Sequence, residues 1–372
     1  MKRLLLALGF FLLVVSCGGS NPAPTSIFEI AVVGSCHETS QDQHMVPCYW
    51  TDTEGWVNMG IPWGGYAGIS SGINDNGYIT GWIESPTING TDYDSAAFIW
   101  SKDSGYTHIE HPGGDPLNDE IDTFDITNNN RISFESNNGA GTWTDNGGVV
   151  FFTPTPSFDT AFAGSDNGTV VGWDDNTAGT FKVATEWKEV SGSWVSTGLG
   201  VLDTSHTESQ AKSVNDNGLI VGLSGVSQGK YWWNVTSRFA WHIQPGGSMT
   251  AVPDCGNGIN LWQTAMDVNN NDLVVGYIDD NNGDSFAYYW SPGDPQATCF
   301  HQDGVSRAVS DDGVILGDNN RNYREQDPIT GQNADCWLAD TAGTGPPTIT
   351  QITAVPSGFF VNFCEDVGKL RN

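Results

Sequence analysis

The sequence predicts an all-β protein, specifically a β-propeller of seven four-stranded blades. Three observations support this class. Helix signals are scarce, short β-branched and aromatic runs alternate with turns rich in Gly, Asn and Asp, and one pattern recurs seven times along the 372 residues. Length alone would suggest two ordinary domains, but the repetition outweighs that prior because repeat folds run long as one unit.

The clearest copy of the repeated hairpin is SGINDNGYITGWIES, residues 71–85, which places a tight turn between two apolar runs. Gly77 occupies the position of this turn whose residue type is most informative when the copies are compared. At that position the other copies carry Asn130, Gly168, Gly218, Asp272 and Gly313. These are the residue types that tolerate a positive φ in a tight turn. We therefore interpret the Asn and Asp content of the turns as backbone chemistry rather than metal ligation.

An aromatic strand ending in tryptophan follows each turn, after a β-branched run and a loop of variable length. These tryptophans are Trp50, Trp100, Trp143, Trp187, Trp241, Trp290 and Trp337, which lie 43 to 54 residues apart. That spacing is typical of one four-stranded propeller blade per repeat. A tryptophan that recurs at one structural position favours a packing anchor between blades over a sugar-binding platform.

The succession of turn, VVG, loop and aromatic strand resembles the bacterial extracellular HAF repeat, named for a His-Ala-Phe triplet. The triplet survives as AFIW at residues 97–100, FAW at 239–241 and SFA at 285–287, and its histidine is missing throughout. The resemblance covers residues 28 to 340. It implies an exported repeat protein, without a shared activity or catalytic set.

The repeats divide residues 28–368 into seven predicted blades. Their ranges are 28–65, 66–115, 116–156, 157–204, 205–256, 257–303 and 304–356. The first copy lacks the preceding strand and turn, whereas the C-terminal segment GFFVNFCEDV is strand-like and lacks a tryptophan partner. We therefore expect a strand at 357–367 to complete the first blade and to close the ring, which would leave no free sheet edge.

The N-terminal residues carry the pattern of an export signal. Lys2 and Arg3 precede an apolar run, residues 4–15, that is too short to span a bilayer, so residues 1–16 predict a signal peptide. The run VVSC resembles the lipobox of bacterial lipoproteins, which implies diacylglycerol on Cys17. Gly18 rather than Asp follows, and in that family this favours the outer membrane, facing the periplasm or the surface. Residues 17–27 have tether composition. The alternative is an ordinary secretory signal with an incidental cysteine.

The other six cysteines predict disulfides, because an exported chain meets an oxidising compartment and no CxxC motif occurs. They are Cys36, Cys48, Cys255, Cys299, Cys336 and Cys364. Six cysteines allow 15 connectivities. Cys36 and Cys48 flank one hairpin and are the pair that the sequence predicts most directly.

The charge balance excludes one class of partner. Lys and Arg number 14 against 44 Asp and Glu, a formal net charge of −30. Such a surface repels nucleic acid and anionic lipid, so we expect no nucleic-acid partner and membrane contact only through the lipid anchor. A protein or glycan of the cell envelope remains as the expected partner. The acidity itself indicates a soluble exported protein, a salty habitat or a cation site.

Loops between the second and third strand of each blade vary in length, as a binding rim requires. Two of them carry clustered aromatic or Arg/Tyr side chains. The candidate ligand-binding residues are Tyr231, Trp232, Trp233, Arg321, Tyr323 and Arg324. Exposed aromatics stack on sugars or anchor partner proteins, and Arg with Tyr is typical of interface hot spots. The alternative is that Tyr231 and Trp233 point inward from an extra strand.

One loop is a candidate calcium site. It contains Asp279, Asp280, Asn282 and Asp284, and calcium prefers such carboxylate and carbonyl oxygens. The spacing departs from an EF-hand loop, and the alternative is a solvated turn. No other cofactor is expected.

Catalytic signatures are missing from the sequence: it has no HExxH, GxGxxG or P-loop, no GxSxG nucleophile elbow at a strand-to-helix turn, and its seven histidines are scattered. We therefore expect a non-catalytic recognition or assembly module of the cell envelope. Two alternatives stay open. One is a propeller hydrolase or lyase that acts on polysaccharide with rim carboxylates. The other is a passive structural envelope protein.

Overall fold

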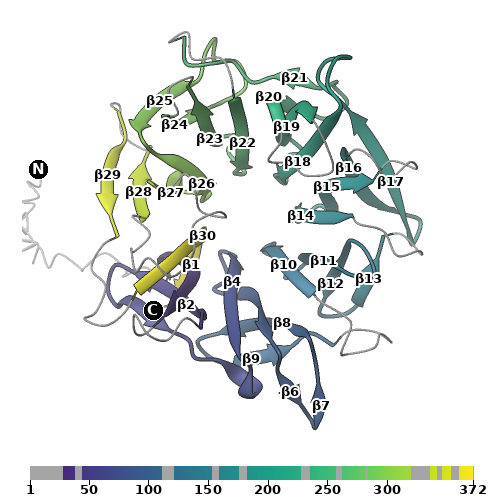
Figure 1. Cartoon of the computed structure of the whole chain (residues 1–372), viewed down its shortest axis with the longest axis vertical. Helices are drawn as coiled ribbons and strands as arrows, with labels where there is room; N and C mark the ends of the chain where they lie inside the picture. The colour runs from purple at the N-terminus through teal and green to yellow at the C-terminus, as the bar shows by residue number, and fades with distance from the viewer. Residues whose placement is uncertain are drawn as a thin grey trace, which may run out of the picture.

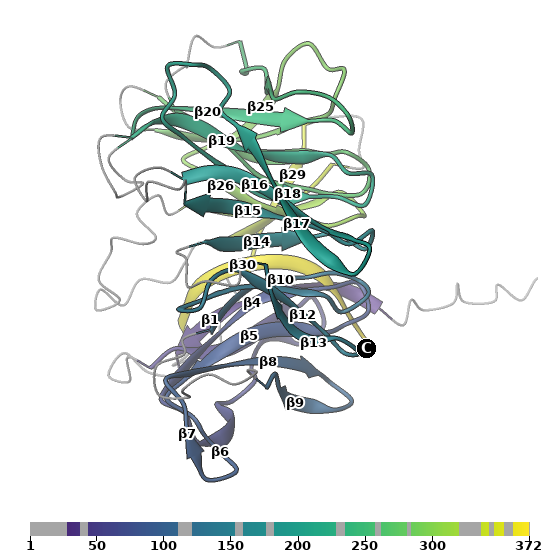
Figure 2. The same cartoon turned by 90° about the vertical axis from the view of Figure 1, so that its right-hand side faces the viewer.

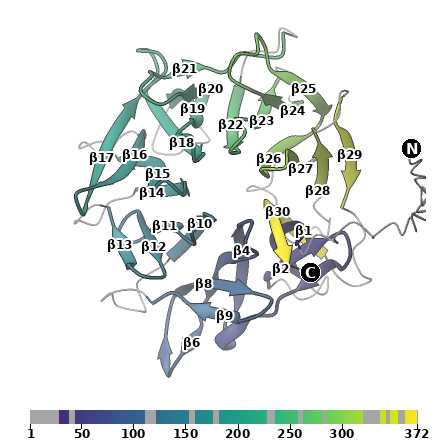
Figure 3. The same cartoon turned by 180° about the vertical axis from the view of Figure 1, so that it is seen from behind.

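The structure is a computed structural model, and it describes residues 28–37, 44–110, 121–152, 159–175, 182–227, 235–256, 262–280, 284–319, 336–341, 346–352 and 360–371. Within these ranges the chain is almost entirely β, with one short 3-10 turn, η1 (Pro62–Gly64). Four-stranded antiparallel sheets follow one another around a common centre, the arrangement of a β-propeller (Figures 1 and 3). The predicted all-β class of antiparallel four-stranded sheets is confirmed.

The sheet that contains both ends of the described chain has the order β3-β2-β1-β30. Its strands are β1 (Phe28–His37), β2 (Val46–Thr51), β3 (Gly55–Asn58) and β30 (Phe360–Arg371). The innermost strand, β30, pairs antiparallel with β1 from Phe28 opposite Arg371 to His37 opposite Phe360. The C-terminal strand therefore runs four residues beyond the expected end at residue 367. It does so because β1 already begins at Phe28 and offers partners along its whole length.

In the other sheets the strands follow one another in chain order. The next has the order β4-β5-β8-β9, with β4 (Ala67–Ile73), β5 (Ile79–Glu84), β8 (Ser95–Ser101) and β9 (Gly105–His108), and carries a small hairpin, β6 (Thr87–Ile88) and β7 (Thr91–Asp92). Two four-stranded sheets follow. Their strands are β10 (Ile121–Ile126), β11 (Ile132–Ser136), β12 (Gly141–Thr144), β13 (Gly148–Phe151), then β14 (Thr160–Gly164), β15 (Thr169–Asp175), β16 (Lys182–Val190) and β17 (Ser193–Gly200).

A larger sheet joins two successive sets of strands through a single parallel bridge between Arg238 and Trp262. Its strands are β18 (Glu208–Val214), β19 (Ile220–Ser227), β20 (Val235–Ile243), β21 (Thr250–Ala251), β22 (Trp262–Val268), β23 (Val274–Asp279), β24 (Ser285–Trp290) and β25 (Thr298–Gln302). The last set comprises β26 (Val305–Val309), β27 (Val314–Asp318), β28 (Cys336–Asp340) and β29 (Thr348–Gln351). The strands nearest the centre are β4, β10, β14, β18, β22, β26 and β30 (Figure 1).

The hairpin turn that follows each inner strand except β30 has the backbone that the sequence predicts. Gly77, Asn130, Gly168, Gly218, Asp272 and Gly313 all have φ between 60° and 88°. In the clearest copy, the Gly77 N–H donates to the Asn74 carbonyl and the Asn74 N–H donates to the Tyr78 carbonyl. This is a three-residue loop whose last residue is left-handed. The interpretation of this position as backbone chemistry is confirmed.

The hydrophobic core lies between neighbouring sheets. Trp241 of β20, for example, is fully buried and packs in one cluster with Val171 of the preceding sheet, and Trp337 of β28 packs with Val275 and Ala287. Trp187 and Trp290 are buried too, whereas Trp50, Trp100 and Trp143 are half-buried. Burial between sheets is what a packing anchor requires.

The prediction that these tryptophans share one structural position is wrong for two of them. Trp50, Trp100, Trp143, Trp187 and Trp290 lie opposite Val32, Ile79, Ile132, Val170 and Val274 of their neighbouring strands. Trp241 and Trp337 sit two residues earlier and lie opposite Gly222 and Gly317. Their rings lie against those glycines, where a Cβ would come within 2.8 Å and 2.1 Å of the indole. These two glycines therefore leave room for a ring on the next strand, as Gly81 does for Phe98.

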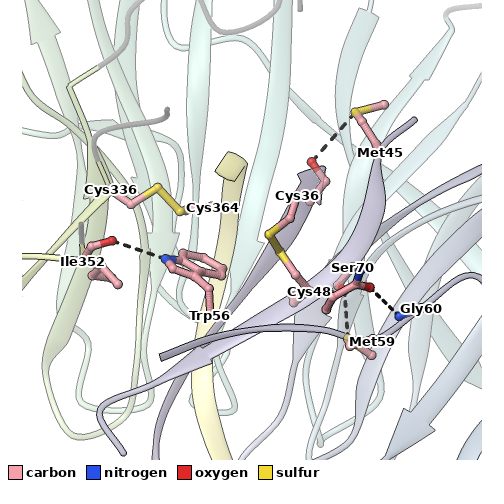
Figure 4. The surroundings of a disulfide bond; sticks show 12 residues. Cys36, Met45, Cys48, Trp56, Met59, Gly60, Ser70, Cys336, Ile352 and Cys364 are labelled. Carbon is pink, nitrogen blue, oxygen red and sulfur yellow. Dashed lines mark hydrogen bonds between the residues drawn. A yellow bond between two sulfur atoms is a disulfide. The ribbon is translucent and has the colours of Figure 1, made fainter. Parts of the chain in front are cut away.

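Three disulfides join Cys36 to Cys48, Cys255 to Cys299 and Cys336 to Cys364. The predicted pair Cys36–Cys48 links β1 and β2. The pair Cys336–Cys364 links β28 to the C-terminal strand β30 and so connects two neighbouring sheets (Figure 4). Close to it, the Trp56 indole N–H donates to the Ile352 carbonyl at 3.3 Å. No helix in the described ranges has the length and apolar character needed to cross a membrane.

Candidate functional site

Most of the site residues predicted from the sequence lie outside the described residues. They are Cys17, Tyr231, Trp232, Trp233, Asn282, Arg321, Tyr323 and Arg324. Lipidation at Cys17 and recognition by the two variable loops therefore stay predictions.

The described part of the candidate calcium loop holds its carboxylates against its own chain. One Asp280 carboxylate oxygen accepts the Asp284 N–H at 2.8 Å, and the Asp280 N–H donates to the Asp284 carbonyl. The Asp279 carboxylate accepts the Ser285 hydroxyl. Within the ranges that the structure describes, no group of three or more His, Cys, Asp or Glu side chains is placed to hold a metal ion. The calcium hypothesis stays a prediction, because Asn282 is not described.

A cavity of about 230 Å³ lies at the centre of the propeller, on the rim of the inner hairpin turns. Each inner strand contributes a β-bulge to its wall. In the six strands that lead into a turn the register skips one residue shortly before that turn, and in β30 it skips Glu365. A bulge of this kind redirects a side chain. The skipped residues, all of which line the cavity, are Ser71, Phe124, Phe162, Lys212, Met266, Arg307 and Glu365.

The cavity wall has an apolar part and a charged part. The rings of Phe124 and Phe162 meet edge to face with centroids 5.3 Å apart. The Lys212 ammonium lies 3.8 Å from the centroid of the Phe162 ring, within cation–π range. Arg307 donates from Nε to the buried carboxylate of Asp318 at 2.7 Å, which fixes the direction of its guanidinium.

Three further residues with carboxyl groups, Asp125, Asp267 and Asp366, line the same cavity and are half-buried. Each follows the bulged residue of its strand. The Asp125 carboxylate accepts the N–H of Gly164 at 2.9 Å, on the next inner strand. In the same way, Asp366 accepts the N–H of Ile73 and Asp267 accepts the N–H of Val309. These carboxyl groups thus join neighbouring inner strands and satisfy amides that the bulges leave unpaired.

Burial raises the pKa of these aspartates. Desolvation is the largest cause, the mutual repulsion of the carboxylates adds to it, and the backbone N–H donors oppose it. The pKa of Asp125 is raised to about 7, and that of Asp366 is raised well above its ordinary value. Asp267 also accepts the Ser213 hydroxyl, and its pKa is raised as well.

The turns around the cavity are bonded to one another in a series that we call the turn belt: residues 74–77, 127–130, 165–168, 215–218, 269–272 and 310–313. Two contacts repeat from turn to turn. The backbone N–H of Asp216 donates to the Asn270 side-chain oxygen at 2.8 Å, and the Asn217 amide donates to the Asn270 carbonyl at 2.9 Å. The same pair of contacts joins each turn of the belt to the next, except that the second turn uses the backbone N–H of Asn129, one position later than the backbone donors of the other turns.

The belt is interrupted where β1 and β30 pair, because the chain enters and leaves there and no hairpin joins these strands. Lys369 of β30 lies in the gap. Its ammonium pairs with Asp312 at 3.1 Å on one side and with Asp75 at 3.5 Å on the other. A single cation therefore bridges the last turn of the belt and the first.

The sequence held a signal for this cavity that motif reasoning missed. The turn residues are nearly uniform between copies, yet the residue three positions before the first turn residue is Ser71, Phe124, Phe162, Lys212, Met266 or Arg307. A variable position inside a uniform motif is typical of a side chain that faces a site rather than the shared core.

No family model matches the chain, and no curated protein does. The HAF-repeat resemblance therefore stays a prediction. Among solved structures, the extracellular domain of BT4673 from B. thetaiotaomicron has 10% identity and a TM-score of 0.46 over 80% of this chain, which spans 34% of the length of that chain. TolB from Acinetobacter baumannii has 10% identity and a TM-score of 0.40, covering 71% of this chain and 61% of its own.

The WD40 domain of SCAP from fission yeast also has 10% identity and a TM-score of 0.40, covering 89% of this chain and 91% of its own. We draw no functional argument from likenesses at this level.

Proposed function

We propose that this chain is an exported, lipid-anchored propeller of seven blades, closed by its C-terminal strand, and that it acts as a non-catalytic recognition or assembly module of the cell envelope. One observation carries the proposal. Phe28 lies opposite Arg371, so the two ends of the described chain leave the propeller together. That point is on the rim of the turn belt, since Lys369 of β30 contacts two of its turns.

This geometry gives the molecule two different faces. A tether attached before Phe28 would hold the turn belt towards the membrane. The opposite rim, where β5 ends at Glu84 and β8 begins at Ser95, would then point away from it, as the edge-on view allows the reader to follow (Figure 2). The described ends of the second and third strands, between which the sequence varies in length, lie on that outer rim, and variable loops on a rigid scaffold are suited to recognition.

The count of seven blades rests on the belt. Each of its six turns joins the first two strands of one blade. The pairing of β30 with β1 supplies the inner strand of a seventh blade. Sharing a blade between the two ends of the chain removes the free edges that would otherwise invite aggregation. We therefore propose that the pairing of β30 with β1 closes the ring.

Lipid anchoring is tested by detergent phase partition of the protein expressed with its own N-terminus. We expect the wild-type protein in the detergent phase and the Cys17→Ser variant in the aqueous phase, because only the former carries diacylglycerol. A wild-type protein that stays aqueous would exclude the anchor.

Recognition is tested by crosslinking and pull-down from the native envelope, with wild type, a Trp232→Ala/Trp233→Ala variant and a Tyr66→Ala control. Tyr66 is 53% exposed, so the Tyr66→Ala variant controls for nonspecific binding by exposed aromatic side chains. We expect one stoichiometric partner that is lost only from the double variant. A partner retained by all three proteins would contradict the role of this loop. Release of soluble sugar from envelope polysaccharide would instead favour the hydrolase or lyase.

A further inference from the structure

We propose that a group of aromatic side chains on the outer rim binds a neutral sugar unit of a glycan, at a site separate from the loop of Trp232 and Trp233. These side chains, which we call the aromatic cluster, are Trp63, Tyr93, Tyr106 and His108. The site deepens the proposed recognition function by naming a ligand class, and it rests on that function for the outward direction of this rim.

The aromatic cluster is built where three segments meet at the sheet β4-β5-β8-β9. Trp63 lies in η1, ahead of β4, and β4 begins opposite Glu84 on the outer rim. Tyr93 directly follows the β6–β7 hairpin, and Tyr106 and His108 belong to β9. The hairpin projects from the ring on the side away from the C-terminus (Figures 1 and 2). It is the only small hairpin of this kind in the described ranges.

The rings of the aromatic cluster contact one another edge to face. The centroid of the Trp63 ring lies 6.1 Å from that of Tyr106 and 5.7 Å from that of His108. The Tyr93 and His108 centroids are 5.3 Å apart. Tyr106 also packs at 4.9 Å on the ring of Phe98, which is fully buried. The core therefore supports the cluster from one side, whereas all four of its side chains are only half-buried.

Three of these rings carry polar groups that have no hydrogen-bond partner within the described ranges. They are the Trp63 indole N–H, the Tyr93 hydroxyl and the His108 ring nitrogens, and each is accessible to solvent. Desolvation lowers the pKa of His108, and Glu110 partly opposes it, so the imidazole is neutral at pH 7 and offers one donor and one acceptor. Sugar hydroxyls pair with such groups, while aromatic faces pack on the C–H groups of the sugar ring.

The backbone of Trp63 is left-handed, with φ 57° and ψ 22°, which is unfavourable for a bulky aromatic residue. Two hydrogen bonds hold this loop. The Gly65 N–H donates to the Pro62 carbonyl at 3.2 Å, and the Tyr106 hydroxyl donates to the Gly60 carbonyl at 2.9 Å. Only part of the Trp63 ring is buried, so packing against the core alone does not account for this residue. Unfavourable backbone conformations of this kind concentrate at ligand sites.

The surroundings of the aromatic cluster favour a small, neutral ligand. In the described part of the chain, the large apolar side chains that are well exposed are Tyr66, Val190, Val195 and Phe239, and the last three lie on β16, β17 and β20. A protein interface needs a broad apolar centre, which this part of the rim does not offer. The net charge of −30 repels acidic sugars. A neutral sugar unit fits both conditions.

The test is calorimetric titration of the purified full-length protein with four neutral hexasaccharides, namely maltohexaose, laminarihexaose, mannohexaose and galactohexaose. We expect at least one of them to bind. Hexagalacturonate should bind at least about tenfold more weakly than that sugar, because the charge of the protein repels it. Choline probes the other ligand that aromatic groups attract, a quaternary ammonium ion, and should bind more weakly too.

Two substitutions in the aromatic cluster and one outside it locate the site. Trp63→Gly removes the ring and keeps a residue that suits the left-handed backbone, so it should weaken binding of the hexasaccharide about tenfold. Tyr93→Phe removes only a hydroxyl, and it should weaken binding about fivefold at an unchanged melting temperature. Tyr66→Ala is the matched control, because Tyr66 lies on the same rim but contacts the His44 ring instead, and it should leave binding unchanged.

Four results would overturn this assignment. The first is no binding of any neutral hexasaccharide up to about 10 mM. The second is hexagalacturonate or choline that binds more tightly than all four. The third is equal binding by wild type, Trp63→Gly and Tyr93→Phe. The fourth is a loss of sugar binding only in the Trp232→Ala/Trp233→Ala variant, which would retain glycan recognition on the outer rim but move it to the other loop.

Discussion

The turn belt and the seam, where β1 and β30 pair, both join neighbouring parts of the ring, but they do so through different contacts. In the belt, each turn follows its inner strand directly, and short side-chain amides join it to the next turn, as Asn217 does to the Asn270 carbonyl. At the seam no turn exists. Lys369 bridges Asp75 and Asp312 instead, and the Cys336–Cys364 disulfide ties β30 to the preceding sheet.

The difference teaches how a ring of repeats manages its ends. Where the chain is continuous, local hydrogen bonds fix the position of a turn at a low cost in conformational entropy. Where two distant segments must meet, the entropy of bringing them together is larger. The Cys336–Cys364 bond does not join β30 to β1, but it restricts the C-terminal segment in the unfolded chain. The last belt turn reflects this change, because it carries Asp312 where the other turns have an asparagine.

Removal of the seam strand is the change with the largest expected effect. Deleting residues 357–372 takes away the partner of β1 and exposes an inner strand edge. We expect loss of the single cooperative melting transition in calorimetry, with aggregation. A truncated protein that melts like the full-length protein would contradict the seam's role in holding the ring.

The disulfide of the seam comes next. From loop length alone, the 28-residue separation of Cys336 and Cys364 predicts a loss of about 3.5 kcal/mol on replacement by serine, and the 44-residue separation of Cys255 and Cys299 predicts about 4 kcal/mol. We expect the reverse order, since only the first pair holds the terminal strand. Urea unfolding of the two double-serine variants measures both, and a larger loss at Cys255–Cys299 would refute this ranking.

Two carboxyl groups that join neighbouring inner strands, Asp125 of β10 and Asp366 of the seam, have a raised pKa and make stability depend on pH. A carboxyl group whose pKa is raised on folding binds protons more tightly in the native state, so its contribution to stability is complete below pH 3.8 and is lost as pH rises through its folded pKa. For Asp125 that folded pKa is about 7. We expect the free energy of unfolding to fall between about pH 4 and pH 8 by an amount on the order of a few kcal/mol.

Asp125→Asn tests the source of this slope. The amide keeps an oxygen for the Gly164 N–H but carries no charge, so the variant should show a shallower decline of stability with pH in urea titrations at several pH values. An unchanged slope would assign the effect to Asp366 at the seam or to the net charge of the chain.

Local features of the fold could be predicted from the sequence, and non-local ones could not. The positive φ at Gly77 and its counterparts follows from residue type, and the Cys36–Cys48 pair follows from a short separation along one hairpin. The partner of Cys336 depends on where the C-terminal strand docks, which no local pattern specifies. The two-residue offset of Trp241 depends on a glycine of the neighbouring strand.

The cavity escaped prediction for a related reason. Lys212 reads as an exposed lysine in an alternating strand, and only the β-bulge turns it towards the centre. A bulge is a pairing irregularity between two strands, so it is recognisable in sequence only when the copies are compared position by position.

The smallest expected effects come from two substitutions, one at a contact of the belt and one at the cation of the seam. Asn215 is buried, its amide donates to the Asn269 carbonyl and to Asp272, and its side-chain oxygen accepts the Leu219 N–H. Asn215→Ala leaves these buried groups unpaired and should cost about 2 kcal/mol of unfolding free energy.

Lys369→Met removes ion pairs in which the Asp312 side chain is 56% exposed, so we expect a loss of only about 0.5 kcal/mol, and none at about 1 M salt. Chemical denaturation of both variants at low and high salt measures the contrast. The salt dependence distinguishes the two kinds of contact. Salt screens the ion pairs of Lys369, whereas it leaves the hydrogen bonds of the belt unchanged. A salt-independent loss at Lys369 would mean that its aliphatic stem, packed between two turns, matters more than its charge.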